Sequence, residues 1–397
     1  MLSGCRVVDC SDQLGWLAGR MLADLGADVV KIEPPGSSHE GPAWRAYNVN
    51  KRLLPINLET EAGWALLEGM LDHTDVLIES AHPGSPLASL FDPERVANRH
   101  PGLVHVSITP FGRSGPRAHW QASDLELMAA GGAMSLAGDP DGEPVRVSSP
   151  QSYPWAGAHG AVGALVALIG RATIGRGQHV DVSAQASVIP ALAHAPTFFD
   201  LLGVTPGRSG AFMTGRALDG ARFRVFWPCA DGFLNFILYG GTAGRRSNEQ
   251  LLAWMSEAGA PLGALSSVDW STFAPTKLTQ EEIDQLEAPI GNFFRSITMQ
   301  KFLEETSSRE MLGYPAFTVA DIASDPQLTA RNFWHDVTDQ DGSQHRYCGA
   351  FLMVDGERTP LHIPQHGNTE LPEILTMFAL TAEEIAKLTN IAVEVAA

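Results

Sequence analysis

The sequence predicts an α/β protein with a Rossmann-like large domain, built on an open parallel sheet, and a smaller α+β domain. Short apolar strands alternate with helices between residues 6 and 108, and this alternation is typical of a doubly wound parallel sheet. Aromatic-rich strands with glycine turns replace the alternation between about 208 and 239. That change of pattern indicates a separate domain.

The first elements form a strand–helix–strand unit. A short apolar strand at 6–9 precedes a helix from about 13 to 25, in which apolar residues recur at helical spacing. Gly26 follows, at the place where a left-handed residue commonly ends a helix. A second strand lies at 28–33. The helical crossover between the two strands predicts that they are parallel members of an open sheet.

The next elements repeat this pattern. Strand, helix and strand follow one another at the spacing of doubly wound topology, and a region rich in glycine and alanine then becomes helical. We expect a helix at 61–71, a strand at 75–79, a helix at 93–99, a strand at 103–108 and helical structure from 120 to about 197, interrupted by a strand at 179–183.

These elements divide the chain into three predicted segments. Residues 1–205 form the N-terminal part of the large domain. Residues 206–324 form the small domain, in which acidic helices follow the aromatic strands. Residues 325–397 return to strand-like sequence and form a C-terminal segment.

Composition narrows the class of partner. The 397 residues include 45 acids and 27 bases, which gives a net charge of -18. A nucleic acid is excluded as the main partner because it requires a basic face. No stretch approaches the roughly 18 consecutive apolar residues of a membrane span, and the N-terminus lacks a signal-peptide pattern. We therefore expect a cytoplasmic protein that binds neither a membrane nor nucleic acid.

Three common kinds of site are not supported by the motifs. A dinucleotide cofactor requires a glycine-rich loop after the first strand, but residues 10–15 contain one glycine. A serine hydrolase requires a Gly-x-Ser-x-Gly turn between a strand and a helix, which does not occur. A metal site requires clustered ligands, whereas the 13 histidines are scattered and the four cysteines form no CxxC pair. We expect no metal site.

Six motifs occur in a characteristic order, at 29–36 (Val-Val-Lys-Ile-Glu-Pro-Pro-Gly), 50–52 (Asn-Lys-Arg), 75–79 (Asp-Val-Leu-Ile-Glu), 107–116 (from Ser-Ile-Thr-Pro-Phe-Gly), 175–178 (Gly-Arg-Gly-Gln) and 325–328 (Asp-Pro-Gln-Leu). Together they resemble the CoA-transferase family III, which also contains the α-methylacyl-CoA racemases. The resemblance covers nearly the whole chain and is weakest from about 240 to 310.

The resemblance implies a fold and a chemistry. The implied large domain is built from both ends of the chain, so that residues 325–397 rejoin it. The resemblance also implies a dimer in which two chains interlock as threaded rings. CoA moves from one acid to another through anhydrides on an Asp, whose carboxylate attacks the thioester. A coenzyme A thioester is then a substrate, and no covalently bound cofactor is expected.

The Asp that this chemistry requires is missing from its place. Counting back from Gly175 places Tyr153 there, and no Asp or Glu occurs from residue 144 to residue 180. A tyrosine with an ordinary pKa of about 10 is a poor nucleophile at neutral pH. Tyr153 and Trp155 either block a pocket or line one. Racemase chemistry also lacks its base, because the His that the resemblance implies is Ser123 here.

Further site residues follow from the same resemblance. Several cations that would favour the CoA phosphates are replaced by other residues. A glycine segment either corresponds to the loop that closes over the reaction intermediate in some relatives or is a plain connecting loop. The CoA-binding positions are Gln13, Ser80, Ala81, His82 and Gln121, and the candidate lid glycines are Gly240, Gly241 and Gly244.

These features predict a non-catalytic subunit of a heteromeric CoA-transferase, whose homologous partner supplies the Asp. The resemblance is to the succinyl-CoA:benzylsuccinate type from anaerobic aromatic degradation, so we expect a succinyl-CoA-like donor and a carboxylic acid acceptor. Two alternatives stay open. The chain is a self-sufficient transferase that uses another carboxylate, such as Asp124, Asp139 or Glu143, or it is a binding or regulatory protein without CoA chemistry.

Overall fold

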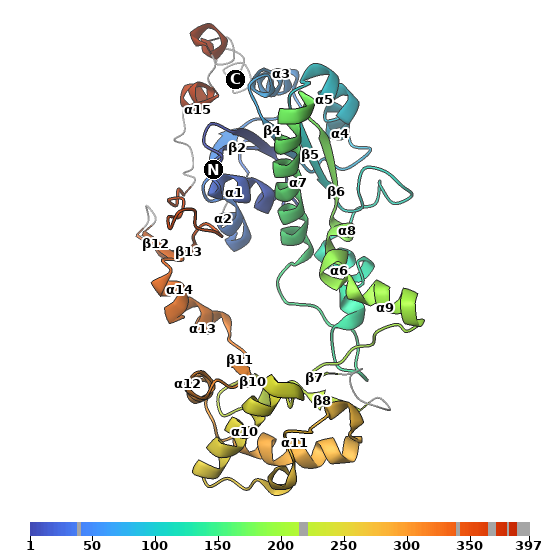
Figure 1. Ribbon diagram of the computed structural model, residues 1–397. Coiled ribbons are helices and arrows are strands. Elements are labelled where there is room, and N and C mark those ends of the chain that lie inside the picture. Colours follow the sequence, from blue (N-terminus) through green and yellow to red (C-terminus); the bar gives the residue numbers. More distant parts are fainter. Residues whose placement is uncertain (38–40, 214–220, 339–341, 364–370, 379–380, 387–397) are drawn as a thin grey trace. The chain divides into compact units, whose positions relative to one another are not determined.

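The structure is a computed structural model, which describes residues 1–37, 41–213, 221–338, 342–363, 371–378 and 381–386. It divides into two compact units (Figure 1). The sequence placed residues 135–145 in the large domain, but the structure groups them with the second unit, where Arg208 donates hydrogen bonds to the carbonyls of Asp139 and Gly142. The first unit contains Met1–Met134, Arg146–Thr205 and Leu328–Ala397, and the second contains Ser135–Val145 and Pro206–Gln327.

A six-stranded parallel sheet forms the centre of the first unit, in the order β3-β2-β1-β4-β5-β6. The prediction of a Rossmann-like open parallel sheet is thereby confirmed. The edge strand β3 was not predicted, because its four residues begin with an arginine and end with a proline and form no apolar run. The strands are β1 (Arg6–Cys10), β2 (Asp28–Glu33), β3 (Arg52–Pro55), β4 (Val76–Glu79), β5 (Val104–Thr109) and β6 (His179–Ser183).

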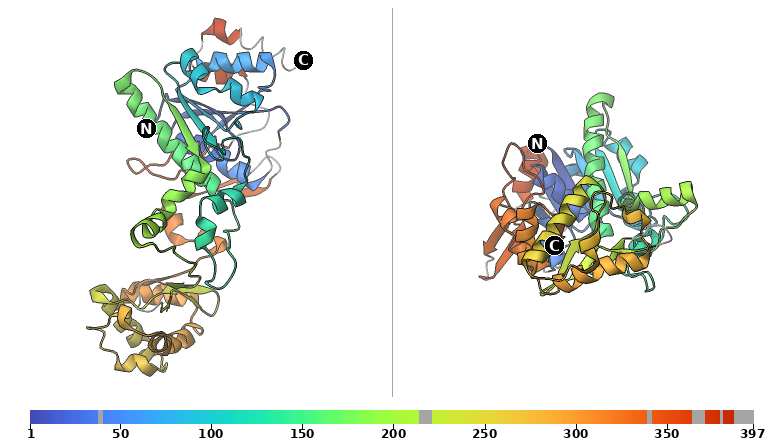
Figure 2. Two further views of the ribbon diagram at one scale, coloured as in Figure 1. Left: turned by 90° about the vertical axis from the view of Figure 1, so that its right-hand side faces the viewer. Right: turned by 60° about the horizontal axis from the view of Figure 1, so that its bottom comes forward.

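Helices cover both faces of this sheet (Figures 1 and 2). Adjacent residues of β1 show the two layers: Val7 packs in the core with α1 and α7, and Val8 packs in the core with α3, α4, α5 and α15. This alternation follows from the pleat of a strand. The helices are α1 (Trp16–Asp24), α3 (Glu61–Leu71), α4 (Pro86–Leu90), α5 (Pro93–Arg99), α7 (Ser152–Ile174) and α15 (Leu371–Met377).

Helix α7 is long and apolar enough to cross a membrane by length and composition alone, which the search for uninterrupted apolar runs did not anticipate. In this fold it packs along α1 and β5, and it leads directly into β6. Gly175 ends the helix with a φ of 72°, a left-handed conformation that glycine adopts without strain. A Cβ on Gly177 would lie 1.9 Å from the carbonyl oxygen of Leu103. The two glycines of the Gly-Arg-Gly-Gln motif are therefore required by the backbone.

The C-terminal segment packs against the first unit. Ile374, Leu375 and Phe378 are fully buried in the core that α3 also forms. Glu373 forms an ion pair with Arg52, at 2.9 Å. The first unit is thus built from both ends of the chain.

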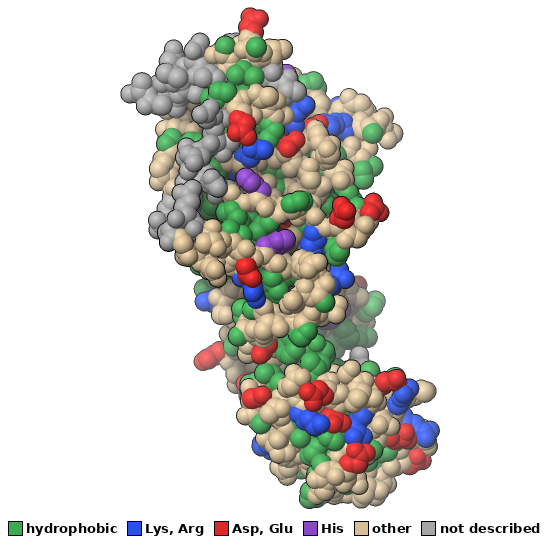
Figure 3. All heavy atoms as spheres, turned by 90° about the vertical axis from the view of Figure 1, so that its left-hand side faces the viewer, with side chains coloured by type: hydrophobic (Ala, Val, Ile, Leu, Met, Phe, Trp, Pro, Cys, Tyr) green, Lys and Arg blue, Asp and Glu red, His purple; other side chains and the backbone are tan. Residues whose placement is uncertain are grey.

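The second unit contains a three-stranded antiparallel sheet in the order β11-β10-β9 and an aromatic core that includes Trp227, Phe236, Phe294 and Phe302. Acidic and basic side chains intermingle on the face shown in Figure 3. Its elements are β7 (Phe212–Met213), β8 (Phe223–Arg224), β9 (Phe226–Pro228), β10 (Phe233–Phe236), β11 (Gly313–Pro315), α10 (Gly241–Glu257), α11 (Gln280–Phe294), α12 (Met299–Arg309) and α13 (Val319–Ala323).

The remaining elements connect these parts or extend the first unit. Strands β12 and β13 pair antiparallel as a two-stranded sheet. The elements are α2 (Pro42–Asn48), α6 (Asp124–Ala130), α8 (Ala184–Val188), α9 (His194–Leu202), α14 (Pro326–Ala330), β12 (Trp334–Thr338) and β13 (Gln344–Cys348).

Candidate functional site

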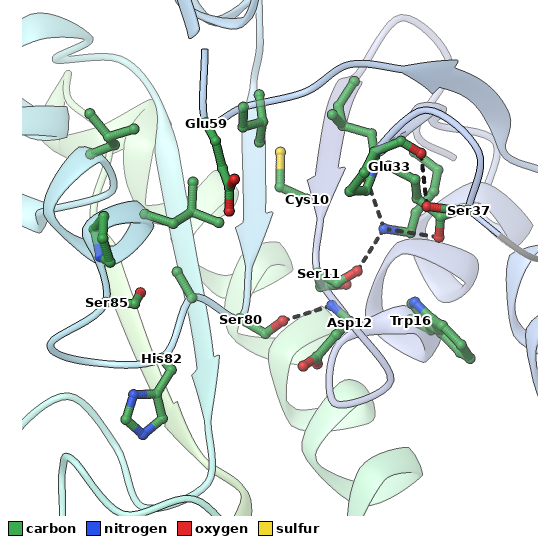
Figure 4. A pocket seen from close by; sticks show the side chains of 18 of the residues that line it. Cys10, Ser11, Asp12, Trp16, Glu33, Ser37, Glu59, Ser80, His82 and Ser85 are labelled. Atoms are coloured by element: carbon green, nitrogen blue, oxygen red, sulfur yellow. Dashed lines mark hydrogen bonds and ion pairs between the residues drawn. The ribbon is translucent and has the colours of Figure 1, made fainter. Parts of the chain in front are cut away.

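A cavity of about 1030 Å³ lies at the carboxyl ends of β1, β2 and β4 (Figure 4). The strand order reverses between β1 and β4, and open α/β sheets bind ligands at such a switch point. Small-molecule sites typically measure about 300–1,000 Å³, so this cavity is the candidate site. It is lined by Trp16, Ser37, Trp44, Leu58, Glu59 and Leu90 and by residues 10–12, 31–34, 80–82 and 85–87.

A buried ion pair fixes the connection between β1 and α1, which forms one wall of the cavity. The Lys51 Nζ lies 2.8 Å from Asp9 Oδ2 and donates to the Trp16 carbonyl and to Asn48 Oδ1, at 2.7 Å each. Burial lowers the pKa of Lys51 to about 8, against the attraction of Asp9. Burial alone would raise the pKa of Asp9, but the two buried lysines hold it below its ordinary value. The pair thus holds β1, α1 and α2 together.

Lys31 is the one lysine or arginine among the described residues of the cavity wall, and its ammonium group is already well bonded. It donates to the carbonyl oxygens of Ser11 at 2.6 Å and Ile32 at 3.2 Å, and its Nζ lies 3.6 Å from Glu33 Oε1. Its side chain is 2% exposed. Three donors of an ammonium group are therefore directed at protein acceptors.

Three carboxylates line the same cavity among the residues that the structure describes. Glu33 ends β2 and accepts a hydrogen bond from Trp44 Nε1 at 3.0 Å. The Asp12 Oδ1 accepts from the Leu14 backbone at 2.9 Å, and desolvation by its surroundings raises the pKa of Asp12. Glu59 is exposed in the segment that follows β3. Figure 4 shows Cys10 between Glu59 and Glu33, and Ser11 next to Asp12. The cavity wall is therefore acidic.

The structure places three of the predicted CoA-binding positions in the cavity wall. Ser80, Ala81 and His82 follow β4 and line the cavity. The Ser80 Oγ accepts a hydrogen bond from the Asp12 backbone at 2.7 Å, and Glu79 Oε2 accepts one from the Ala81 backbone at 2.6 Å. The first bond joins the ends of β1 and β4 across the switch point, and the second fixes the turn that follows β4.

The other two positions lie elsewhere. Gln13 is exposed in the turn before α1, and Gln121 is exposed in the segment before α6. Neither is among the described residues that line the cavity. Their assignment to a CoA site stays a prediction.

Tyr153 lies in the first turn of α7, where its hydroxyl oxygen accepts a hydrogen bond from the Asp124 backbone at 2.9 Å. Burial raises the pKa of Tyr153, and the nearby carboxylates of Asp124 and Asp12 raise it further. The phenol therefore stays protonated at neutral pH. Tyr153 and Trp155 are both half-buried, and neither is among the described residues that line the cavity.

Asp124 is the alternative carboxylate whose backbone is hydrogen-bonded to Tyr153. Its Oδ1 accepts hydrogen bonds at the start of α7. It accepts hydrogen bonds from the backbones of Gln151 and Ser152 and from the Ser152 hydroxyl, each at 2.8 Å. Orphan N–H groups at the start of a helix require such acceptors. Asp124 therefore caps α7. Ser123 in turn begins α6 in a capping box with Glu126.

Two further carboxylates named as alternatives belong to the second unit. Asp139 and Glu143 are exposed there. The backbone carbonyl of Asp139 accepts a hydrogen bond from Arg208 at 3.2 Å. A nucleophilic role for either residue stays a prediction.

The glycine segment proposed as a lid is helical rather than a loop. Gly240 is the N-cap of α10, and Gly241 and Gly244 lie inside that helix. Leu251 and Met255, which recur at helical spacing, are fully buried in the core of the second unit and hold the helix in place. This corrects the expected loop, and a lid role for the three glycines stays a prediction.

Sequence reasoning missed Asp12, Lys31 and Glu59 as residues of the site. A usable signal existed for Asp12, because it follows β1 directly and the carboxyl ends of parallel strands share one edge of a sheet. Glu59 follows an edge strand that was itself not recognised. Lys31 lies inside a strand, and only the structure shows its ammonium at the cavity.

Comparisons with known proteins agree on one family. The family model described as CoA-transferase family III matches residues 2–369. The chain is 31% identical to subunit BbsE of the succinyl-CoA:(R)-benzylsuccinate CoA-transferase of Thauera aromatica, over 87% of this chain and 86% of that protein. It is 27% identical to the succinate–glutarate CoA-transferase of Agrobacterium fabrum, over 92% of this chain and 90% of that protein. Among solved structures, a CaiB/BaiF family protein from Brucella suis superposes with a TM-score of 0.74 at 26% identity, covering 91% of this chain and 95% of that one.

Proposed function

The chain belongs to CoA-transferase family III, and we propose that it is the subunit of a heteromeric CoA-transferase that lacks the nucleophilic Asp. The reaction class follows from the family: CoA is transferred from a thioester to a carboxylic acid, and the CoA thioester is a substrate. The finer proposal is that a homologous partner chain supplies the carboxylate. We assign Tyr153 to the nucleophile's place by counting back from Gly175. The observation that supports the proposal is that the Tyr153 hydroxyl accepts a hydrogen bond from the Asp124 backbone and has a pKa raised by burial.

The chemistry explains why this substitution matters. In the transfer, a carboxylate oxygen attacks the thioester carbonyl carbon, the C–S bond breaks, and the thiolate of CoA leaves while an anhydride forms. A phenol with a raised pKa supplies almost no anion at neutral pH, and an aryl ester is not an anhydride. The nearest alternative, Asp124, is committed to the start of α7.

Exposed apolar side chains on α7 and α9 support a partner chain. Ile169 on α7 is 74% exposed and Leu201 on α9 is 72% exposed. Several large apolar side chains exposed on the same helices favour a protein–protein interface. The same helices expose Val162, Val166, Phe198, Phe199 and Leu202. We propose that a homologous chain covers these helices in an interlocked dimer, and that the complex is cytoplasmic.

The substrates are proposed from the relatives. The Thauera protein is named for succinyl-CoA and (R)-benzylsuccinate, and the Agrobacterium protein for succinate and glutarate. We propose a succinyl-CoA-like donor and a dicarboxylic acceptor, which includes benzylsuccinate and therefore a place in anaerobic aromatic degradation.

A CoA-transfer assay tests the proposal. The chain is purified alone and then mixed with its co-encoded homologue, and succinyl-CoA and a panel of carboxylic acids are followed by mass spectrometry. We expect no transfer by the chain alone and transfer in the mixture. Transfer that is abolished by Asp→Asn substitution in the homologue would place the nucleophile there. Transfer by the chain alone would overturn the non-catalytic role.

One observation favours a second candidate, a self-sufficient transferase that uses Asp12. This carboxylate lines the cavity and lies near enough to Tyr153 to raise the pKa of the phenol. If the chain alone is active, Asp12→Asn should abolish the activity while keeping the bond from the Leu14 backbone. Asp124→Asn is the matched variant, because it keeps an acceptor at the start of α7. If the Asp124→Asn protein is inactive and the Asp12→Asn protein is active, the nucleophile is Asp124 instead.

A further inference from the structure

The charges around the cavity are not complementary to those of CoA, the ligand that the family uses. Among the described residues that line it, the carboxylates are Asp12, Glu33 and Glu59, and the one lysine or arginine is Lys31. CoA carries a 3′-phosphate and a diphosphate, which proteins hold with cations or with free backbone N–H groups. An anionic nucleotide would therefore meet net negative charge at this edge of the sheet.

Lys31 does not compensate for this charge. Its ammonium group donates to the carbonyls of Ser11 and Ile32 and lies 3.6 Å from Glu33. Turning it toward a phosphate would break these bonds and leave buried carbonyls without a donor, which is costly in a low-dielectric interior. Lys31 thus stabilises the protein's own carbonyls and carboxylate.

The cavity nevertheless has the features of a binding site for a ligand without phosphate. Ile32, Leu87 and Leu90 supply apolar surface in its wall. Glu59 adds an exposed negative charge to the wall, which disfavours a phosphate there. Carboxylates accept hydrogen bonds from hydroxyl groups, and the acid that ends β2 in dinucleotide-binding sheets binds a ribose diol.

We infer that this pocket takes a nucleoside-sized ligand that presents hydroxyl groups and carries no phosphate, and that it rejects the nucleotide end of CoA. Glu33 ends β2 at the ribose position of such sheets, and the apolar wall is suited to a planar base. The inference deepens the proposed function and rests on it, because CoA is the ligand that the family pocket would otherwise hold. It confines CoA binding to the pocket of the partner chain.

A binding experiment with three probes tests the inference. Adenosine, adenosine 3′,5′-bisphosphate and CoA are titrated into the full-length chain by isothermal titration calorimetry at two salt concentrations. The first two probes differ only in their phosphates. We expect adenosine to bind at least tenfold more tightly than the bisphosphate and CoA, with the difference shrinking at high salt because charge repulsion is screened.

Charge reversal at Glu59 provides the second part of the test. Glu59→Lys should raise the affinity for the bisphosphate at least tenfold and leave adenosine within about threefold, since one repulsive charge becomes attractive. Glu61→Lys is the matched control, because it makes the same charge change on an exposed residue outside the lining. It should leave both affinities unchanged.

Three outcomes would overturn the inference. They are a wild-type affinity for the bisphosphate or CoA equal to that for adenosine, no binding of any probe, and an equal response to Glu59→Lys and Glu61→Lys. None of these outcomes depends on turnover. Tight CoA binding with no transfer by the chain alone would contradict the pocket inference and leave the heteromer proposal standing. Transfer by the chain alone, with adenosine still bound preferentially, would contradict the heteromer proposal and leave the pocket inference standing.

Discussion

Replacing Lys51 by methionine should destabilise the first unit more than any comparable surface substitution. Lys51 is fully buried, and its ammonium group is bonded to Asp9 Oδ2, the Trp16 carbonyl and Asn48 Oδ1 at 2.7–2.8 Å. Methionine replaces the side chain as far as Cε but supplies no donor. Three buried acceptors on β1, α1 and α2 would then lose their partner at once.

The magnitude follows from these three contacts. A buried acceptor left unpaired costs about 1–3 kcal/mol, and removal of one member of a buried ion pair costs about 3–5 kcal/mol in total. Lys31 remains near Asp9 and lowers the pKa of that carboxylate as well, so part of the charge stays compensated. We therefore expect Lys51→Met to lower the free energy of unfolding by about 3–5 kcal/mol.

Urea denaturation measures this free energy from the midpoint and slope of the transition. Arg52→Met is the matched control, because Arg52 is the next residue and forms a partly exposed ion pair with Glu373. Exposed pairs contribute about 0–1 kcal/mol. Equal losses for the two variants would refute the reasoning, since burial would then have no bearing on the cost of removing the charge.

Three further predictions concern the same unit. Asp124→Ala removes the acceptor for three hydrogen bonds at the start of α7 and should cost about 2–3 kcal/mol of unfolding free energy in urea; a loss below about 0.5 kcal/mol would contradict the capping role. Gly177→Ala places a Cβ 1.9 Å from the Leu103 carbonyl oxygen and should lower the melting temperature by several degrees, as expected for about 1–3 kcal/mol of overpacking; an unchanged melting temperature would contradict the close approach. Because burial lowers the pKa of Lys51 to about 8 in the folded chain from 10.5, the unfolded state binds more protons between these values, and stability should rise from pH 8 to pH 10.5 in wild type relative to Lys51→Met; parallel pH profiles would show that the pKa of Lys51 is not lowered.

The sequence by itself determined the class of fold and the lack of any acidic residue near Tyr153 in the chain. Helical and strand periodicities are local patterns, so the strands at 6–9, 28–33, 75–79 and 103–108 could be recognised from neighbouring residues, and the structure contains a strand at each place. The absence of any Asp or Glu between residues 144 and 180 is likewise a property of the chain alone.

Local pattern was misleading where tertiary packing decided the outcome. The Gly240–Gly244 region has the composition of a loop, yet it begins α10, because Leu251 and Met255 bury one face of that helix. The edge strand β3 has no apolar run of its own and becomes a strand because it pairs with β2.

The tertiary structure also decided what each polar residue of the site does. The Asp12 backbone donates a hydrogen bond to Ser80, which lies 68 residues later in the chain, and Asp124 accepts one from the Ser152 backbone, 28 residues later. Lys31 lies within an apolar strand, and the turn after β1 brings the Ser11 carbonyl to its ammonium group. The physical reason is that buried charges and helix ends must find partners, and the order of strands in the sheet, which no local pattern records, determines which partners are within reach.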